Sequence, residues 1–355
     1  MVYCAETVAH PVECEIGTSL KVLVVTAMYP HAGNEGYGAF VEQQVEQLRA
    51  LGHQVDVLHF PGYRSPLEYL KGAREVSRRT HRKGYDVVHA HYGVTGLATL
   101  FRNGIPLVVT LHGSDALLGW HQPLISRIVC ALADSTIVAS RKIADRIPGE
   151  IIPCGVDLPV FEPKPKSEAR QRLKLELDRK YVLFPFNPAR SIKRFDLASG
   201  AVAKLAGEGV DIELLTVSKI PNGEMPWYYS ASDVMILCSD SEGSSTAVKE
   251  ALACNLPVVC TNVGDVTEIT QGIAGVHLAE QTAASLARAL KRVLYPPAGF
   301  VFNGRTAMER YSQPKTAAAI LRVYRRVIEQ RLLKHSSRRD AERTRTKPAT
   351  DSKLQ

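Results

Sequence analysis

The strongest constraint on the fold is a regular alternation of short apolar runs with longer helix-forming stretches. A first series of apolar runs, rich in Val, Leu and Ile, lies at 20–28, 54–60, 85–93, 106–115 and 135–140. A second series follows at 181–187, 212–217, 234–238 and 257–261. Runs of this length that alternate with helices are typical of buried strands in parallel, doubly wound sheets. The sequence therefore predicts two α/β halves, with ligands bound in the cleft beyond the carboxyl ends of their strands.

The composition is that of a globular protein without a membrane span. Hydrophobic residues make up 45% and charged residues 23% of the 355 positions, and no apolar run reaches the roughly 18 residues that a spanning helix needs. The first residues, MVYCAETVAHPVECEIGTS, lack the basic start and the apolar core of a secretory signal. Seven cysteines without a CxxC pair favour free thiols in a reducing compartment. We therefore expect a cytoplasmic protein.

The formal net charge of +8 is concentrated near the C-terminus. From Arg322 to Gln355 there are eleven Lys or Arg and four Asp or Glu, so the rest of the chain is close to neutral. A near-neutral body has no broad basic face for a duplex, and we expect no nucleic-acid partner. Residues 334–355 are polar and lack Phe, Tyr and Trp, which predicts a disordered basic tail.

A second basic run, KGAREVSRRTHRK at 71–83, follows the apolar residues Leu67, Tyr69 and Leu70. One interpretation is an ordinary solvated helix face. The other is peripheral contact with an anionic membrane leaflet, where each Lys or Arg adds about 1 kcal/mol. In that case the protein would work at the inner face of the cell membrane without spanning it.

Two glutamates eight positions apart, Glu242 and Glu250, stand in the segment SEGSSTAVKEALACNLPVV. A helix-favouring run places Glu242 in the loop before a helix and Glu250 about two turns inside it. Carboxylates suit sugar and ribose hydroxyls because each accepts two hydrogen bonds in a fixed plane. Taken alone, the pair is more often an ordinary turn and helix with a solvated glutamate. The residues between them that we expect to bind the donor through backbone N–H groups and hydroxyls are Gly243, Ser244, Ser245 and Thr246.

This segment and its surroundings resemble the Glu-x7-Glu signature of the retaining GT-B glycosyltransferases of family four, also called glycosyl transferases group 1. In that family the first Glu contacts the donor sugar and the second the nucleotide ribose, roles that the resemblance gives to Glu242 and Glu250. It also implies the GT-B fold, in which two Rossmann-like doubly wound domains face each other across a cleft. The resemblance extends over about residues 20 to 330. Ser245 departs from it, because the family often has Pro there.

The domain boundaries that follow are a flexible leader at 1–19, an acceptor domain at 20–165 and a nucleotide-sugar donor domain at 166–314. The Pro-rich segment PKPKSEA at 163–169 is the expected linker. A helix at 315–333 would pack back toward the N-terminal domain, as the family's C-terminal helix does, and the basic tail would follow at 334–355.

The loop NPARSIKRFD, directly after the first strand of the second half, resembles the family's Arg and Lys pair that grips the donor phosphates. We assign this role first to Lys193 and next to Arg190, and expect Arg194 to be solvated. Negative charge develops on the departing diphosphate as the anomeric bond breaks. Cations placed there stabilise the transition state more than the ground state.

The N-terminal half supplies further candidates at the ends of its strands. The segment TLHGSD resembles the family motif whose histidine orients the donor sugar, a role carried over to His112, and Asp115 could contact the acceptor hydroxyl. We also expect His91 to contact the acceptor at the floor of the cleft. Gly36 and Gly38 resemble the family's glycine-rich acceptor and phosphate loop, although glycines also serve tight turns.

His89 and His91 alternate on a strand and so face the same side, which would allow them to bind a metal as a pair. No third ligand is evident, and the chain has no Asp-x-Asp motif for a metal diphosphate bridge. We therefore expect no metal site and no cofactor, with the nucleotide sugar acting as a substrate only.

These features predict a retaining glycosyltransferase that moves a hexosyl or related group from a nucleotide-sugar donor to a glycan or lipid-linked acceptor. HYGVTG, HGSD and the phosphate loop look closest to bacterial transferases of cell-surface polysaccharide synthesis, of the teichuronic-acid and exopolysaccharide type. One alternative is a catalytically silent nucleotide-sugar binding protein, which the joint presence of Lys193, Glu242, Glu250 and His112 disfavours. Another is a different GT-B enzyme, such as a nucleotide-sugar epimerase, which lacks this Glu pair, or a phosphorylase, which would need a pyridoxal lysine.

Overall fold

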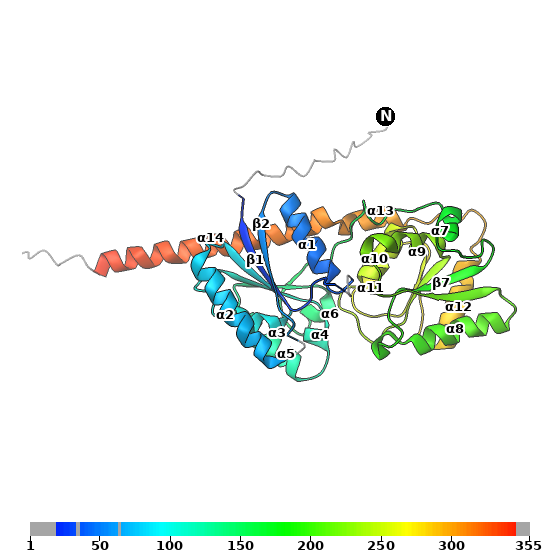
Figure 1. Ribbon diagram of the computed structural model, residues 1–355, viewed down its shortest axis with the longest axis horizontal. Helices are drawn as coiled ribbons and strands as arrows, with labels where there is room; N and C mark the ends of the chain where they lie inside the picture. The colour runs from blue at the N-terminus through cyan, green and yellow to red at the C-terminus, as the bar shows by residue number, and fades with distance from the viewer. Residues whose placement is uncertain (1–18, 33–35, 63–64, 346–355) are drawn as a thin grey trace, which may run out of the picture.

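The computed structural model describes residues 19–32, 36–62 and 65–345 and arranges them in two α/β halves (Figure 1). The N-terminal half contains a six-stranded sheet and the C-terminal half a five-stranded sheet. All recorded strand pairs in both sheets are parallel. The predicted fold class, two doubly wound α/β domains, is confirmed.

The N-terminal sheet has the strand order β2-β1-β3-β4-β5-β6. Its strands are β1 (Lys21–Thr26), β2 (Gln54–His59), β3 (Val87–His91), β4 (Leu107–Leu111), β5 (Ser135–Val138) and β6 (Glu150–Ile151). The helices between them are α1 (Ala39–Ala50), α2 (Pro66–Arg82), α3 (Gly93–Gly96), the 3-10 helix η1 (Leu97–Thr99), α4 (Ser114–Leu117), α5 (His121–Leu132) and α6 (Arg141–Ala144).

The C-terminal sheet has the order β11-β10-β9-β7-β8. Its strands are β7 (Lys180–Phe184), β8 (Ile212–Thr216), β9 (Val234–Leu237), β10 (Val258–Cys260) and β11 (Val276–Leu278). The helices are α7 (Lys166–Arg172), η2 (Ser191–Lys193), α8 (Phe195–Gly207), η3 (Asn222–Glu224), α9 (Met225–Ala231), α10 (Thr246–Ala253), α11 (Val266–Thr270), α12 (Ala283–Leu294), α13 (Gly304–Met308), η4 (Glu309–Tyr311) and α14 (Gln313–Arg345).

Strand β1 illustrates why each sheet needs helices on both faces. Leu23 and Val25 belong to one buried cluster, and Val22 and Val24 belong to another. Successive side chains of a strand point to opposite faces, so a strand whose residues are all apolar must be covered on both sides. The apolar runs of the sequence thus form the strands of the two sheets. The carboxyl ends of these strands lie where the two halves face each other.

The chain passes between the halves twice, and the two passages are joined by hydrogen bonds. After β6 the chain leaves the N-terminal half, and it returns between η4 and α14. The backbone N–H of Val156 donates to the carbonyl of Tyr311 at 2.9 Å, and the N–H of Gln313 donates to Val156 at 3.0 Å. This short paired segment ties the two passages between the halves to each other.

Helix α14 packs back on the N-terminal half, against α1 and β4. Val323, Tyr324 and Val327 are buried in the same cluster as Val22 and Leu48. The helix then continues beyond the body of the protein (Figure 1), with Leu333 largely exposed.

The predicted disordered tail at 334–355 therefore needs correction in its first part. Residues 334–345 belong to α14, and 346–355 lie outside the described residues, as does nearly all of the predicted leader at 1–19. Composition alone misses this extension, because adding residues to a helix already nucleated by packing requires no new nucleus.

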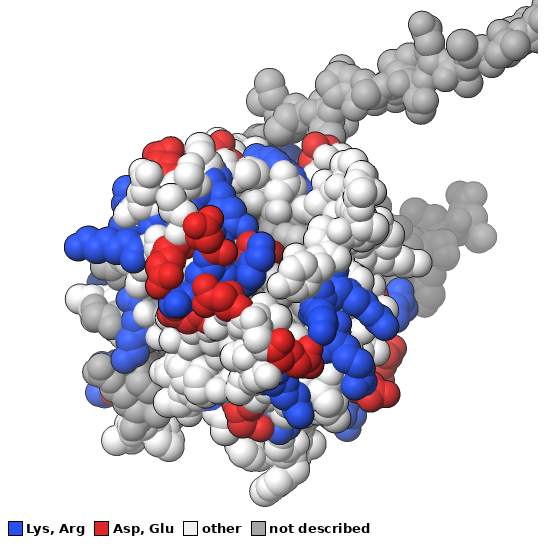
Figure 2. Space-filling view, turned by 90° about the vertical axis from the view of Figure 1, so that its right-hand side faces the viewer, with Lys and Arg blue, Asp and Glu red and all other residues white. Residues whose placement is uncertain are grey.

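No helix among the described residues is long and apolar enough to cross a membrane. Figure 2 views the molecule from the end formed by the C-terminal half, and Lys or Arg side chains there lie next to Asp or Glu side chains. In this half, for example, Arg179 pairs with both Asp211 and Glu213. This face thus offers no continuous basic surface of the kind that a duplex needs.

Candidate active site

Two glycines bring the halves of the protein into backbone contact. Gly113 follows β4, and Gly243 precedes α10. A Cβ atom added to Gly243 would overlap the carbonyl oxygen of His112, and one added to Gly113 would lie 2.8 Å from Cα of Gly243. Gly113 also has a φ of 132°, which disfavours other residues. This contact sets the loop that carries Glu242 directly against the loop that carries His112.

Glu242 and Lys193, from separate loops of the C-terminal half, form an ion pair. Nζ of Lys193 lies 2.5 Å from Oε1 of Glu242, and the hydroxyl of Ser239 donates to the same oxygen at 2.7 Å. The ammonium also lies 4.1 Å from the ring centroid of Phe186. Lys193 is only 8% exposed, so its charge acts in a poorly solvated place, where electrostatic interactions are stronger.

Glu250 lies within α10, where the hydroxyl of Tyr229 donates to its Oε2 at 2.9 Å. Burial raises the pKa of this carboxyl to about 7, while the Tyr229 hydrogen bond and the charge of Lys249 act in the opposite direction. Part of the Glu250 residue nevertheless remains accessible to solvent. Glu250 is thus a carboxyl group that changes charge near neutral pH.

The loop between the two glutamates is held by a buried ion pair that the sequence did not suggest. Lys249 and Asp265 are fully buried, with Nζ 3.1 Å from Oδ2. The Ser244 hydroxyl donates to Asp265 Oδ2 at 2.6 Å and accepts from Lys249 at 2.5 Å. The backbone N–H of Ser245 donates to the other Asp265 oxygen at 2.9 Å. Asp265 and Lys249 therefore fix the shape of the loop between Glu242 and α10.

This arrangement changes the expected roles of the small residues. The Ser244 hydroxyl and the Ser245 N–H both donate to Asp265, so a donor phosphate would have to displace this carboxylate to bind them. Ser245 is the N-cap of α10, and its side chain makes no capping hydrogen bond. Thr246 is the first residue of the helix. The start of α10 can therefore present its first N–H groups, together with the positive end of the helix dipole, to an anion.

His112 lies at the end of β4 and is neutral. Its Nε2 lies 2.9 Å from Nδ1 of His91, its Nδ1 lies 3.9 Å from Sγ of Cys154, and its ring stacks on that of His91 at an angle of 12°. Burial, followed by the proximity of His91, holds the pKa of His112 well below its usual range. Both ring nitrogens of His112 thus face protein partners, so a sugar hydroxyl would have to displace one of these partners to hydrogen-bond the neutral imidazole.

Two family models match the chain: Glycosyltransferase Family 4 over residues 22–159 and Glycosyl transferases group 1 over residues 192–295. Together the two matched segments make up well over half of the chain. The chain is a glycosyltransferase of this GT-B group. Membership in this glycosyltransferase group, which the sequence predicted, is thereby confirmed.

Known proteins similar to this chain include two bacterial glycosyltransferases. The putative teichuronic acid biosynthesis glycosyltransferase TuaC of Bacillus subtilis is 27% identical, with 77% of this chain and 89% of that protein covered. The D-inositol 3-phosphate glycosyltransferase of Frankia alni is 29% identical, with 70% and 76% covered.

Two solved structures with a similar fold are sucrose-phosphate synthase from Thermosynechococcus elongatus and Anabaena HepE in complex with UDP and glucose. The first has a TM-score of 0.74 at 20% identity, covering 87% of this chain and 100% of that one. The second has a TM-score of 0.64 at 16% identity, covering 86% and 99%. These similarities confirm the GT-B fold.

Asp115 of this glycosyltransferase holds a loop, and its placement differs from the predicted acceptor contact. The residue is 2% exposed. Its carboxylate accepts backbone N–H groups from Gly113 at 2.9 Å, His112 at 3.1 Å and Gly93 at 3.2 Å. Burial, which outweighs these hydrogen bonds, raises its pKa to about 6. Asp115 therefore shapes the turn that presents His112.

His91 is likewise fully buried behind His112 and does not reach the floor of a cleft. Burial lowers its pKa to about 3. His89 lies beside it, with Nδ1 2.6 Å from the hydroxyl of Tyr324 and Nε2 2.7 Å from Oγ1 of Thr110. Among the described residues no group of three or more His, Cys, Asp or Glu side chains is arranged to hold a metal ion.

The glycine loop after β1 approaches the C-terminal half. A Cβ on Gly36 would lie 3.9 Å from the carbonyl oxygen of Ile220, beyond β8. Gly38, with a φ of 74°, is the N-cap of α1, and a Cβ there would lie 2.8 Å from the backbone nitrogen of Tyr29. Gly38 therefore serves a tight turn. The intervening residues 33–35 lie outside the described part of the chain.

The remaining predicted cation, Arg190, is exposed on the loop after β7. Burial raises the pKa of Tyr92 well above its usual range, whereas the charge of Arg190 lowers it. Arg190 thus lies near Tyr92 of the other half. Tyr92 has a φ of 74°, strained for a residue with a side chain, and its ring centroid is 4.9 Å from that of His112. Arg194 pairs with Asp196 and Asp240 at the surface.

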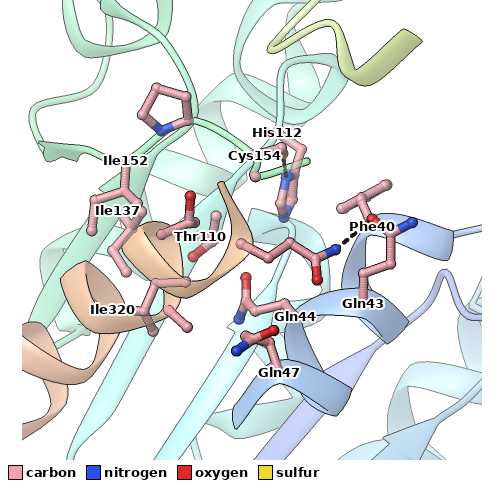
Figure 3. Close-up of a pocket in the computed structure, with 15 residues that line it drawn as sticks. Phe40, Gln43, Gln44, Gln47, Thr110, His112, Ile137, Ile152, Cys154 and Ile320 are labelled. Atoms are coloured by element: carbon pink, nitrogen blue, oxygen red, sulfur yellow. Dashed lines mark hydrogen bonds between the residues drawn. The ribbon is translucent and has the colours of Figure 1, made fainter. Parts of the chain in front are cut away.

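A narrow pocket lies behind His112, between α1, the end of β4 and the start of α14 (Figure 3). It offers about 30 Å³ of space, enough for roughly two water molecules. Amide side chains dominate its polar lining, and Gln313 donates to the Oε1 of Gln43 at 3.0 Å. This pocket is too small for a sugar, but it places polar groups between His112 and the passage that joins the halves.

Proposed function

We propose that this enzyme is a retaining glycosyltransferase that moves a sugar from a nucleotide-sugar donor to a glycan or lipid-linked acceptor in cell-surface polysaccharide synthesis. The observation that carries the proposal is the Lys193–Glu242 ion pair, set across the Gly113–Gly243 contact from His112. The loop that carries His112 touches the loop that carries Glu242 through this glycine contact, and Glu242 is paired with Lys193. A donor lying there would have a cation, a carboxylate and a neutral imidazole around its reacting end.

Each group has a distinct part in the proposed reaction. Lys193, and Arg190 at the edge of the cleft, would stabilise the charge that develops on the departing diphosphate. Glu242 would hold the donor sugar through its hydroxyls, and Glu250 the ribose. His112 would orient the sugar as a neutral hydrogen-bonding partner. In a retaining transfer of this kind, the departing phosphate accepts the proton of the attacking acceptor hydroxyl.

The donor class is supported by the similarity to HepE, whose solved structure is a complex with UDP and glucose. The acceptor class is supported by the similarity to TuaC, which is named for teichuronic acid biosynthesis. The cytoplasm is the proposed location, since the described cysteines are free thiols. We also propose that catalysis needs no metal ion, because Lys193 and the start of α10 supply the positive charge that a metal would otherwise provide.

A donor panel tests the proposed activity. The enzyme is incubated with several uridine, guanosine and adenosine diphosphate sugars without acceptor, and the products are followed by NMR. We expect slow release of free sugar from one donor, with the anomeric configuration retained, and the same rate after addition of EDTA. Absence of turnover with every donor would favour the silent binding protein. A donor converted to its epimer would favour an epimerase. Loss of activity in EDTA, restored by manganese, would contradict the metal-independent reaction.

A further inference from the structure

Helix α5 (His121–Leu132) carries a stripe of exposed apolar side chains along its outer face. Trp120, just before the helix, is 80% exposed, and Leu124, Ile128 and Leu132 are each slightly more than half exposed. These residues are four apart, so they lie along one side of the helix. The opposite side, with the buried Val129, packs on the core of the N-terminal half. Exposed stripes of this extent mark interaction sites, whereas single exposed apolar residues are common.

The stripe continues through Phe101 to helix α2. Phe101 is 66% exposed. The next residue, Arg102, donates to the carbonyl of Leu132 at the end of α5, and Asn103 donates to the carbonyl of Ser77 in α2. Phe101 therefore lies between the two helices. It also lines an open hollow on α2 together with Leu70, Ala73, Arg74, Ser77, Arg78, His81 and Arg82.

The charges around this surface are almost all positive. Segment 116–133 contains no Asp or Glu, and segment 66–83 has six Lys or Arg against two Glu. Both glutamates, Glu68 and Glu75, are already paired with cations of α2. Arg74 and Arg82 form no ion pair with any described residue. The apolar stripe is therefore bordered by cations that have no acidic partner of their own.

We propose that α5, Phe101 and the outer face of α2 form a docking surface for an anionic lipid bilayer. An apolar helix face bordered by cations fits the boundary between headgroups and acyl chains, where apolar side chains are buried and cations meet anionic lipid. Indole rings are favoured at that boundary, as at membrane surfaces in general, and Trp120 is the most exposed of the large apolar side chains here.

The docking surface differs from the one expected from the sequence. The basic run of α2 contributes to it, and Leu67 and Leu70 are exposed. Tyr69, however, packs edge-on against Phe60, and Arg79 bonds Glu75 and the carbonyl of Val57. These two residues therefore face the protein. The main apolar part of the surface is α5.

The docking surface begins next to the active site. The hydroxyl of Ser126 in α5 donates to the carbonyl of Asp115 at 2.7 Å, and Asp115 holds the turn that presents His112. A membrane that contacts Trp120 thus lies at the same edge of the N-terminal half as the end of β4. This geometry lets an acceptor anchored in lipid reach the site, and in that respect the inference rests on the proposed function.

Fluorescence of Trp120 tests the contact directly. The chain has two tryptophans, so a Trp227→Phe variant reports on Trp120 alone and a Trp120→Phe variant on Trp227 alone. We expect Trp120 emission to shift to shorter wavelength when vesicles containing phosphatidylglycerol are added, but not with phosphatidylcholine alone. Trp227 emission should stay unchanged. A Trp120 spectrum that does not respond to anionic vesicles would overturn the proposal.

Flotation with the same vesicles separates the apolar and basic contributions. A Leu124→Ser, Ile128→Ser, Leu132→Ser variant should lower the bound fraction by about tenfold or more. An Arg74→Gln, Arg82→Gln variant should lower it about tenfold, more so at low salt. The matched control for the apolar change is one variant with Leu177→Ser, Leu278→Ser and Val301→Ser. The matched control for the charge change is one variant with Lys219→Gln and Arg292→Gln. Both control variants should bind vesicles like the native enzyme.

Two outcomes would contradict the proposed contact with lipid. Equal loss in the control variants would show nonspecific attraction and contradict the docking surface. A native dimer that becomes a monomer in the α5 variant, seen by sedimentation velocity without vesicles, would identify α5 as a subunit interface instead. Donor hydrolysis in the α5 variant is measured in parallel. Because flotation uses neither donor nor acceptor, it can fail while the proposed transferase activity stands, and the reverse also holds.

Discussion

The Nζ atom of Lys193 lies 2.5 Å from Oε1 of Glu242, which joins the proposed phosphate-binding cation to the proposed sugar-binding carboxylate. A donor phosphate that approaches Lys193 competes with Glu242 for the same ammonium group. Binding therefore has to redistribute this pair, freeing Glu242 for the hydroxyls of the sugar. The pair keeps both side chains in place beforehand, which reduces the reorganisation needed in the transition state.

Replacing Glu242 by Gln or Lys193 by Ala should each reduce the transfer rate about a hundredfold, or roughly 3 kcal/mol, because each removes a contact to the reacting donor. Steady-state kinetics with the donor identified in the panel would measure this. Circular dichroism should show an intact fold. The control is Lys291→Ala, which breaks an exposed pair with Glu208 and should leave turnover unchanged. Native rates in either site variant would refute the assignment.

The pKa of Glu250, raised by burial to about 7, predicts that donor binding depends on pH. The carboxylate needed for the ribose hydroxyls forms as pH rises through about 7, so the donor KM should fall over that range and then level off. Glu250→Gln should raise the donor KM and make it independent of pH in this range. Since the pKa of Asp115 is also raised, to about 6, this variant shows which of the two carboxyl groups causes the pH dependence. A flat profile in the native enzyme would argue against ribose binding by Glu250.

The raised pKa of Glu250 also makes the free energy of unfolding depend on pH. Donor binding should improve as pH rises, whereas stability should fall. Glu250 binds its proton more tightly in the folded enzyme than at the ordinary pKa of 4.5. Its stabilising contribution is therefore complete below pH 4.5 and is lost as pH rises through about 7. Denaturant unfolding at several pH values, with Glu250→Gln as reference, would measure this contribution.

Breaking the buried Lys249–Asp265 pair should strongly destabilise the enzyme. Lys249→Met or Asp265→Asn leaves one buried partner uncompensated, at a cost of about 3–5 kcal/mol in unfolding free energy. The double variant should recover part of this loss, but its donor KM should stay raised because the Ser244–Ser245 loop is no longer held. Arg326→Ala, which breaks an exposed pair with Glu150, should cost about 1 kcal/mol or less. Equal losses for the buried and exposed pairs would contradict this account.

A Gly243→Ala substitution should separate the loops that carry Glu242 and His112, because the new methyl group would overlap the carbonyl oxygen of His112. We expect kcat/KM to fall at least about tenfold, with little change in Tm, since the overlap lies between the halves. Gly223→Ala is the matched control, as a Cβ there meets no atom within 4 Å. If both variants behave alike, the backbone contact does not set the site.

The sequence predicted most of the fold because the strands are marked by local composition. Helix α5 was not predicted, although Leu124, Ile125, Ile128 and Val129 repeat with helical spacing. Its outer face is also apolar, which hides the contrast between the two faces of an amphipathic helix. The length of α14 was underestimated, since its end is stabilised by the packed part of the helix and not by its own composition.

The sequence predicted those residues of the candidate site that lie in short motifs. Glu242, Lys193 and His112 lie in such motifs; the structure pairs Lys193 with Glu242 and sets the loop of His112 against the loop of Glu242. Asp265 and Tyr229 were missed because their partners are remote in sequence, and nothing in their neighbours indicates a role. Asp115 and His91 lie in the predicted motifs, but whether a polar side chain faces a cleft or the interior depends on tertiary packing that no local pattern encodes.

The return of α14 to the N-terminal half has a consequence for biosynthesis. Val323, Tyr324 and Val327 complete a core whose other members include Val22, made about 300 residues earlier. During translation part of the apolar surface of the N-terminal half must therefore stay uncovered until residues 323–327 have left the ribosome. The C-terminal half has all of its strands well before that point, so the domain made second has the means to finish folding first.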